Sequence, residues 1–224
     1  MKTRNISALT VSRLAFFTPG MIKDQRLRLR MVRAFFVGAF AITLLLTASN
    51  VFAFTFTTID VPGATGTGAA RSNAVGQIVG GYTDASGMGH GFLLDKGTFT
   101  TIDPPGSVFT QAIGINAAGR IVGDFELPGQ HHGFLLDKGT FTLIDFPGPS
   151  TGTDALGINA AGQVVGRYVA GGTEHGFLLD KGTFTTVDPP GSTFTEAIGI
   201  NAAGQIVGDY TDASGTGHGF VATP

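Results

Sequence analysis

The chain alternates short apolar runs with turn signals, and the same succession recurs along residues 69–221. In one copy, the apolar positions predict strands over Ala112–Asn116, Arg120–Phe125, Gly133–Leu136 and Phe141–Asp145. The sequences Asn-Ala-Ala-Gly and Asp-Lys-Gly, which separate these runs, are typical of tight hairpin turns because Asn and Gly tolerate positive φ. The runs show little polar alternation, which favours strands covered on both faces.

The spacing of the copies predicts the architecture. The segment Gly-Phe-Leu-Leu-Asp-Lys-Gly begins at Gly91, Gly133 and Gly176, and a shortened copy begins at Gly219, so that successive copies are 42, 43 and 43 residues apart. A period of roughly 40–45 residues with four short strands is typical of β-propeller blades. We therefore predict an all-β fold, a four-bladed β-propeller over residues 54–224.

Residues 54–60, Phe-Thr-Phe-Thr-Thr-Ile-Asp, have the pattern of a fourth strand but precede the first complete repeat. The last repeat ends at its third strand, over His218–Val221, and lacks a fourth. We expect residues 54–60 to fill that position, so that the N-terminal strand of the mature chain closes the ring and covers two sheet edges. A closed ring of this kind is expected to be a monomer. The alternatives are an open β-solenoid and a half-ring that dimerises.

The repeated motif also resembles a known family. The segments Gly114–Gly123, Gly157–Gly166 and Gly199–Gly208 follow the pattern Gly-Ile-Asn-x-x-Gly-x-(Val/Ile)-Val-Gly, and each leads to His-Gly-Phe. This pattern resembles the extracellular HAF-type repeat of bacterial exported proteins, which usually has His-Ala-Phe at the second motif. The resemblance covers nearly all of residues 69–221 in four copies. It implies secretion and repetition, without a settled activity.

Residues 1–53 have the three parts of a secretory signal peptide. Basic residues over 26–33 precede an uncharged apolar run over 34–48, and a Val-Phe-Ala sequence ending at Ala53 supplies a signal peptidase site. The apolar run is shorter than the ~20 residues that span a bilayer, so we expect a Sec-type signal cleaved near Ala53, with an uncleaved anchor as the alternative. The predicted location is the medium, the periplasm or the cell surface, with no membrane span after cleavage.

Composition narrows the functional classes. Residues 54–224 carry six Lys and Arg against fifteen Asp and Glu, whereas residues 1–53 carry eight basic residues and one acid. Phosphate binding needs clusters of Lys and Arg, so the acidic body argues against nucleic acid as a partner. The chain has no Cys, which removes disulfides, thiolate metal sites and cysteine nucleophiles. The 35 Gly residues show no collagen-like triplet, and Val, Ile and Phe are plentiful, which indicates a Gly-rich β protein.

Four histidines begin the third strand of each blade, two strands out from the axis, which is too far apart for them to share a metal ion. If Lys138-Gly139 is a two-residue loop, the register instead places His132 opposite Asp145. A His–Asp hydrogen bond would orient the imidazole and satisfy both groups. We therefore interpret these residues as structural pairs and expect no metal or cofactor. The four predicted pairs are His90–Asp103, His132–Asp145, His175–Asp188 and His218–Asp60.

A ligand site is expected on the face where the repeats differ in length and content, because binding on a rigid scaffold usually resides in variable loops. The opposite face carries the near-identical turns. The variable third-strand entries are Thr83–Gly89, Glu126–His131, Val169–Glu174 and Thr211–Gly217. The candidate binding residues on this face are Phe109, Glu126, Asp154, Glu174, Phe194, Glu196, Tyr210 and Asp212.

Two groups of acidic residues on this face have a second interpretation. Asp154 and Glu196 occupy equivalent positions in adjacent blades, and paired carboxylates about 5–10 Å apart can hydrolyse glycosides. The segments 84–87 and 209–215 contain Asp, Ser and Gly, but they lack the full EF-hand pattern and fit hairpin turns better than Ca²⁺ loops.

The sequence thus favours a non-catalytic exported repeat protein whose loop-rich face binds a glycan or a protein. One alternative is a surface or matrix element whose repeats serve assembly alone. The other is a glycan hydrolase or lyase that acts through Asp154 and Glu196.

Overall fold

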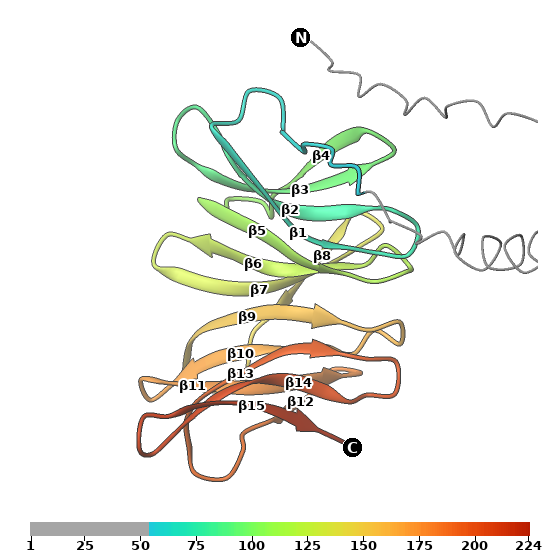
Figure 1. The fold of residues 1–224 in the computed structure, drawn as a ribbon. Helices are drawn as coiled ribbons and strands as arrows, with labels where there is room; N and C mark the ends of the chain where they lie inside the picture. The colour runs from blue at the N-terminus through green and yellow to red at the C-terminus, as the bar shows by residue number, and fades with distance from the viewer. Residues whose placement is uncertain (1–53) are drawn as a thin grey trace, which may run out of the picture. The chain divides into compact units, whose positions relative to one another are not determined.

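The computed structural model describes residues 54–224, which form fifteen strands and no helix (Figure 1). This part of the chain is all-β, as predicted. The predicted signal peptide, residues 1–53, lies outside the described residues. Nothing in residues 54–224 forms a helix that is long and apolar enough to cross a membrane.

The strands form four successive repeats, three with four antiparallel strands and the last with three. The first two repeats consist of β1 (Gly66–Ser72), β2 (Ile78–Thr83), β3 (Gly89–Asp95), β4 (Thr98–Ile102), β5 (Phe109–Ile115), β6 (Ile121–Leu127), β7 (Gln130–Asp137) and β8 (Thr140–Ile144). The other two consist of β9 (Ser150–Ile158), β10 (Val164–Ala170), β11 (Thr173–Asp180), β12 (Thr183–Thr186), β13 (Ser192–Ile200), β14 (Ile206–Asp212) and β15 (Gly217–Ala222). Single parallel bridges join the first three repeats into one sheet.

The turn between the third and fourth strands has the predicted two-residue form. Lys138 and Gly139 have φ angles of 50° and 83°, as a type I′ turn requires at both central positions. Asp137 therefore faces Thr140, and Gly133 faces Ile144. The same Lys-Gly turn, with positive φ at both residues, recurs in the first and third repeats.

The entries to the third strands are shorter than the sequence suggested in two repeats. In the second repeat Leu127 pairs with Gln130, and in the third repeat Ala170 pairs with Thr173, so each hairpin has only two loop residues. Glycines with positive φ at Gly129 and in the third-repeat loop allow these sharp turns. Most of the two expected loops, including their Glu and His residues, therefore lies on strands.

The glycine in each second strand makes room for an aromatic ring. A Cβ atom on Gly123 would lie 1.9 Å from the carbonyl oxygen of Gln111 and 2.9 Å from the ring of Phe134. The Val-Gly of the second strand and the His-Gly-Phe of the third are thus two halves of one packing unit. Phe134 is 1% exposed, and its counterparts Phe92 and Phe177 are completely buried.

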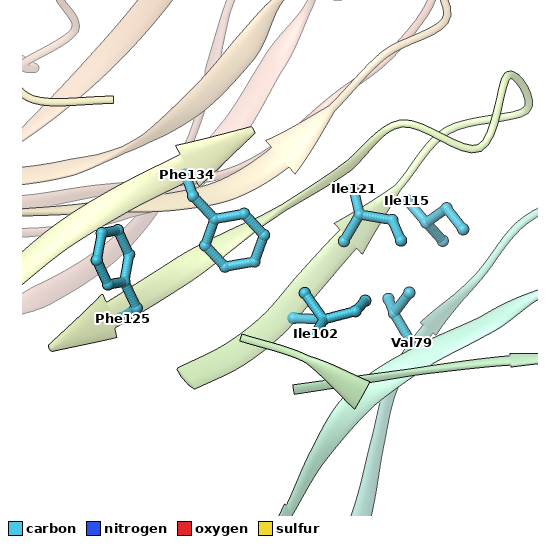
Figure 2. Packing of buried hydrophobic residues seen from close by; sticks show 7 residues of the cluster. Val79, Ile102, Ile115, Ile121, Phe125 and Phe134 are labelled. Carbon is cyan, nitrogen blue, oxygen red and sulfur yellow. The ribbon is translucent and has the colours of Figure 1, made fainter. Parts of the chain in front are cut away.

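The hydrophobic core is divided among the interfaces between successive repeats. In the first interface, Val79 and Ile102 of the first repeat pack with Ile121, Phe125 and Phe134 of the second (Figure 2). A second cluster joins the second repeat to the third in the same way. The third cluster, between the third and fourth repeats, has only three buried members, so the last repeat buries the fewest apolar side chains against its neighbour.

A ladder of asparagine side chains links the repeats beside the first strands. The Nδ2 groups of Asn73, Asn116 and Asn159 each donate a hydrogen bond of 3.0 Å to the carbonyl oxygen of the equivalent Asn in the next repeat. The side-chain oxygen of Asn116 accepts hydrogen bonds from the backbone N–H groups of Ala118 and Arg120, which closes the turn. One residue therefore holds both its own hairpin and the neighbouring repeat.

The predicted closure of the ring is not formed in residues 57–224. The first strands pack in series, β1 on β5, β5 on β9 and β9 on β13, and no packed pair of strands joins the first repeat to the fourth. The ladder stops with Asn201, whose Nδ2 donates only to Gln205 within the described residues. Figure 1 shows the first and fourth repeats at opposite ends of the row.

The predicted closing strand is also absent from the described structure. Residues 54–60 contain no strand, and Phe54 and Phe56 are 82% and 91% exposed. The chain is instead fixed at Val61, whose N–H donates to Thr67 Oγ1 of the first repeat. With this anchor on the first repeat and no packed pair of strands between the two end repeats in residues 57–224, the closed ring from which a monomer was expected is not formed there.

The ladder predicts a graded loss of stability. Asn116→Ala removes the hydrogen bond to the next repeat and leaves the turn N–H groups of Ala118 and Arg120 without their acceptor, so it should lower the free energy of unfolding by about 1–3 kcal/mol. Asn201→Ala removes the equivalent hydrogen bonds within its turn but no hydrogen bond to a following repeat, and Asn201 is exposed. Urea unfolding should therefore show a clearly smaller loss for Asn201→Ala, and equal losses would contradict the role of the ladder.

Candidate functional site

Three equivalent positions in each repeat lie close together, on one side of the first, second and third strands. In the second repeat they are Gln111 on β5, Asp124 on β6 and His131 on β7; Gln111 pairs directly with Asp124. In the third repeat Asp154 on β9 pairs in the same way with Arg167 on β10. We call the twelve residues at these places the variable positions. They are Gly68, Gly81, Gly89, Gln111, Asp124, His131, Asp154, Arg167, Glu174, Glu196, Asp209 and Gly217.

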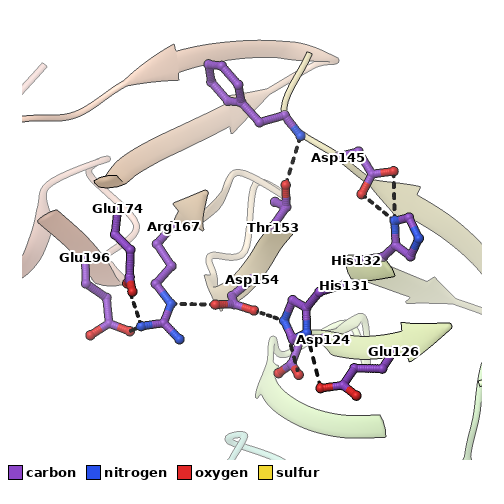
Figure 3. Close-up of polar contacts among 11 residues, drawn as sticks. Asp124, Glu126, His131, His132, Asp145, Thr153, Asp154, Arg167, Glu174 and Glu196 are labelled. Carbon is purple, nitrogen blue, oxygen red and sulfur yellow. Dashed lines mark hydrogen bonds and ion pairs between the residues drawn. The ribbon is translucent and has the colours of Figure 1, made fainter. Parts of the chain in front are cut away.

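The variable positions differ between repeats in a sequence that otherwise repeats closely. The first repeat has glycine at all three, whereas the second and third repeats carry charged or amide side chains at every one. These positions lie at the end of the repeat where the sequence predicted a ligand site. The charged side chains of the second, third and fourth repeats come together there in one polar network (Figure 3).

Asp154 is the centre of the polar network. Its Oδ1 atom forms a short contact with Nε2 of His131, from the preceding repeat, and its Oδ2 atom accepts a hydrogen bond of 2.5 Å from Nε of Arg167. The Asp154 side chain is 11% exposed, whereas His131 and Arg167 are about one-third exposed. Asp154 therefore ties two repeats together and holds the partly exposed side chains of His131 and Arg167.

Four further carboxylates surround these three residues. Nη1 of Arg167 lies 2.8 Å from Oε2 of Glu174 and 3.7 Å from Oε1 of Glu196 in the fourth repeat. His131 lies 3.7 Å from Glu126 through Nδ1 and 3.7 Å from Asp124 through Nε2. The polar network thus consists of Asp124, Glu126, His131, Asp154, Arg167, Glu174 and Glu196.

Asp124 is the least satisfied member of the polar network. Its side chain is 9% exposed and accepts no hydrogen bond from any side chain or loop N–H in residues 54–224. Burial, and next the nearby charge of Asp154, raise the pKa of Asp124 to about 7. Asp124 is thus a buried carboxyl group that changes its charge near neutral pH.

Hydrogen bonds within the network shift the pKa values of the other central groups toward their charged forms. Burial opposes ionisation of Asp154, but the hydrogen bonds from His131 and Arg167 outweigh it and lower its pKa. The hydrogen bond to Asp154 raises the pKa of His131 against the effect of burial. Burial would lower the pKa of Arg167, but its hydrogen bond to Asp154 raises it instead. The arrangement therefore favours the ionised form of Asp154 and the protonated forms of His131 and Arg167.

Three members of the polar network have donor atoms close enough to hold a metal ion. One ligand atom each of Asp124, His131 and Asp154 lie within 4.8 Å of one another. However, both oxygens of Asp154 are already bonded, and the Arg167 guanidinium would repel a divalent cation at this distance. The geometry therefore favours an ion-pair network over a metal centre.

Half of the predicted binding residues belong to the polar network: Glu126, Asp154, Glu174 and Glu196. The other four lie elsewhere. Phe109 packs over Gly89, where a Cβ atom would come within 2.5 Å of its ring. Phe194 and Tyr210 line a separate cavity of about 370 Å³ in the fourth repeat. Asp212 closes a turn by accepting hydrogen bonds from the backbone N–H groups of Ser214 and Thr216.

Sequence reasoning missed Asp124, His131 and Arg167. All three lie on strands; His131 belonged to an expected loop, Glu126–His131, but was not singled out, and Asp124 and Arg167 lie outside the expected loops. A signal was present for His131 and Arg167, because each differs in kind from the residue at the equivalent position of every other repeat, whereas Asp124 has an Asp counterpart in Asp209. Aligning the four repeats on their second and third strands and looking for such exceptions would have found Arg167 and His131.

Three of the four predicted His–Asp pairs are brought together within their repeats. Nδ1 lies 2.7 Å from the Asp carboxylate for His90–Asp103, 2.9 Å for His132–Asp145 and 2.7 Å for His175–Asp188. The fourth pair differs, because His218 contacts Asp212 at 3.2 Å through Nε2. The strand that would carry Asp60 to His218 is not formed in residues 54–60.

The all-glycine variable positions of the first repeat leave a groove. A cavity of about 310 Å³ has Gly68, Gly81 and Gly89 on its floor, with Tyr82 and Phe109 among its walls. Tyr82 stacks on His90, with ring centroids 5.0 Å apart. The site face therefore combines an aromatic groove on the first repeat with a charged network on the following three.

Comparisons with known proteins bear on the fold alone. No protein-family model and no curated protein matches the sequence. Among solved structures, the chain is similar to the acylaminoacyl peptidase of Pyrococcus horikoshii, with a TM-score of 0.50 and 14% identity, over 70% of this chain and 26% of that one. At that identity the likeness carries no activity to this chain.

Two further similar structures have lower scores. The β-propeller domain of the Trilobed protease from Pyrococcus furiosus, described as having an open velcro topology, matches with a TM-score of 0.48 and 12% identity, over 65% of this chain and 48% of that one. The Aleuria aurantia lectin in complex with α-methyl-L-fucoside matches with a TM-score of 0.39 and 15% identity, over 65% and 52%. The chain thus spans about half the length, or less, of the structures that it matches.

The raised pKa of Asp124 predicts a pH-dependent stability. The folded chain holds this proton up to about pH 7, whereas the unfolded carboxyl group releases it near pH 4, so stability should fall as pH rises between these values. Asp124→Asn keeps the neutral shape and removes the titration. We expect the variant to gain about 1–3 kcal/mol over the parent between pH 4.5 and pH 8, measured by urea unfolding.

Asp209 provides the matched control, since it is the exposed counterpart of Asp124 in the fourth repeat. The Asp209→Asn variant should follow the pH profile of the parent. If Asp124→Asn also follows it, the buried carboxyl group does not titrate as described.

Proposed function

We propose that the protein is a non-catalytic, exported binding protein whose repeats act as the blades of a β-propeller, and that it binds a glycan through the face that carries the variable positions. Export rests on the signal-peptide pattern of residues 1–53. A protein ligand on the same face is the alternative to a glycan, and assembly of repeats without a ligand is the second alternative.

The distribution of sequence differences among the repeats is the observation that supports a ligand site. The Asn ladder, the Lys-Gly turns and the buried Phe recur because the scaffold needs them in every repeat. At the variable positions the scaffold has no such need, since glycine is sufficient in the first repeat. Charged side chains that are oriented across the repeat interfaces are therefore best explained by recognition of a ligand.

The chemistry of the polar network suits hydroxyl groups. Asp154, Arg167 and Glu174 present carboxylate acceptors and guanidinium donors held by one another, so little conformational entropy is lost when a ligand replaces water. The ring of Phe109 lies at the neighbouring groove, over Gly89, and offers apolar surface for a sugar ring. Partly exposed polar groups beside a shallow aromatic groove support glycan binding more than binding of an apolar ligand.

The charge of the face sets an expectation for the ligand class. The polar network contains five carboxyl groups against Arg167 and His131. Like charges across an interface are unfavourable, so neutral or amine-bearing glycans are favoured over sulfated or uronic ones.

The enzymatic alternative, with Asp154 and Glu196 as a catalytic pair, has less support. Arg167 contacts both carboxylates, at 2.5 Å from Asp154 and 3.7 Å from Glu196. A guanidinium between the two groups occupies the place that a glycosidic bond would need. Asp154→Asn combined with Glu196→Gln tests this alternative, because loss of turnover with retained binding would favour the enzyme.

A glycan array probed with the purified protein tests the proposed function. We expect binding to a subset of neutral or amine-bearing glycans, and a ~10–100-fold weaker binding after Arg167→Gln, because charge-assisted hydrogen bonds contribute about 1.5–3 kcal/mol each. Arg120→Gln is the matched control, since Arg120 also pairs with an Asp, at 3.0 Å, but belongs to the turn after the Asn ladder. Equal loss in both variants, or binding of proteins but no glycan, would contradict the proposal.

A further inference from the structure

The fourth repeat has an open position beside β15. In the complete repeats a fourth strand covers the third, and its Phe packs edge-to-face on the buried Phe, as Phe141 does on Phe134 at 5.6 Å between ring centroids. Within residues 54–224, β15 pairs only with β14. A cavity of about 380 Å³ lies beside β15, lined in part by Phe220 and Val221.

Side chains of β15 show the effect of the missing strand. Phe220 is only partly buried, whereas its counterparts in the other repeats are at most 1% exposed. Val221 is 66% exposed, and His218 is 40% exposed against 14% for His132. The sequence of β15 matches that of the third strands in the complete repeats, which a fourth strand covers. Within residues 54–224, no fourth strand covers β15.

Residues 55–60 have the sequence that the open position requires. They read Thr-Phe-Thr-Thr-Ile-Asp, identical to residues 98–103 of the first repeat. In that repeat Thr100 faces Leu93, and Asp103 bonds His90. By equivalence, a strand over 55–60 would place Thr57 opposite Val221, Phe56 on Phe220 and Asp60 beside His218.

The same molecule cannot supply this strand in the arrangement described. Residues 60–66 join the segment to β1, and six residues reach at most about 20 Å. In the other repeats an equally short crossing always leads to the adjacent repeat, as residues 144–150 do between β8 and β9. The fourth repeat is not adjacent to the first in the row, because no strands of the two pack together in residues 57–224.

We propose that two copies of the chain complete one another, with residues 55–60 of each copy forming the fourth strand on β15 of the other. Two copies joined in this way at both ends place eight repeats in succession, within the range of ~4–8 blades found in propellers. The Asn ladder then continues from Asn201 to Asn73 of the partner subunit.

An engineered disulfide distinguishes the two sources of the strand. The chain has no Cys, so Thr57→Cys with Val221→Cys creates a single pair whose register follows from the complete repeats. Under mild oxidation we expect a covalent dimer on a non-reducing gel and a mass of two chains in light scattering. A disulfide within one chain, no disulfide, or covalent species larger than a dimer would overturn the proposal.

Two controls make the outcome specific. Thr57→Cys with Val75→Cys, at an exposed residue in the first-repeat turn, should give no dimer. Phe56→Asp should convert the dimer to a monomer, because Phe56 matches the packed Phe99, whereas Phe54→Asp should not, because Phe54 matches the turn residue Gly97. Equal dissociation by both Asp variants, or by neither, would contradict the assigned register.

Discussion

The hydrogen bonds from Asn side chains to the next repeat are the interaction on which the arrangement of the repeats depends. Each repeat alone is a small twisted sheet with few buried residues, and the apolar clusters form only where two sheets meet. Apolar contacts are not directional and would tolerate sliding of one sheet over another. The hydrogen bond of Asn116 to the carbonyl of Asn159, at a buried position, fixes that contact to one register.

The same geometry explains why the polar network lies between repeats. Once the ladder sets the register, His131 of the second repeat comes against Gly152 of the third. His131 packs over Gly152 and reaches Asp154 on the same strand. The network therefore depends on the offset between repeats.

This dependence separates what the sequence could predict from what it could not. The period, the Lys-Gly turns and the pairing of His132 with Asp145 are local, because a two-residue turn sets the register of the strands that it joins. The contact of His131 with Asp154 joins residues in different repeats, and it depends on how far one sheet is rotated against the next. No pattern within one repeat encodes that rotation.

Whether residues 54–60 close the ring could not be read from the sequence for the same reason. The strand-like sequence of the segment was visible, and so was the vacancy after β15, but whether they meet depends on the sum of the rotations along the row. A small difference in angle at each interface, repeated three times, decides whether the ends of one molecule can touch.

The first repeat, with glycine at Gly68, Gly81 and Gly89, indicates how a binding face of this kind can evolve. Its strands β1, β2 and β3 pair without any side chain at these three positions, so the fold does not require one there. Duplication of such a unit would add a new surface at no cost to folding, and later substitutions could give that surface its own chemistry. Each repeat could thus acquire a specificity while its neighbours keep theirs.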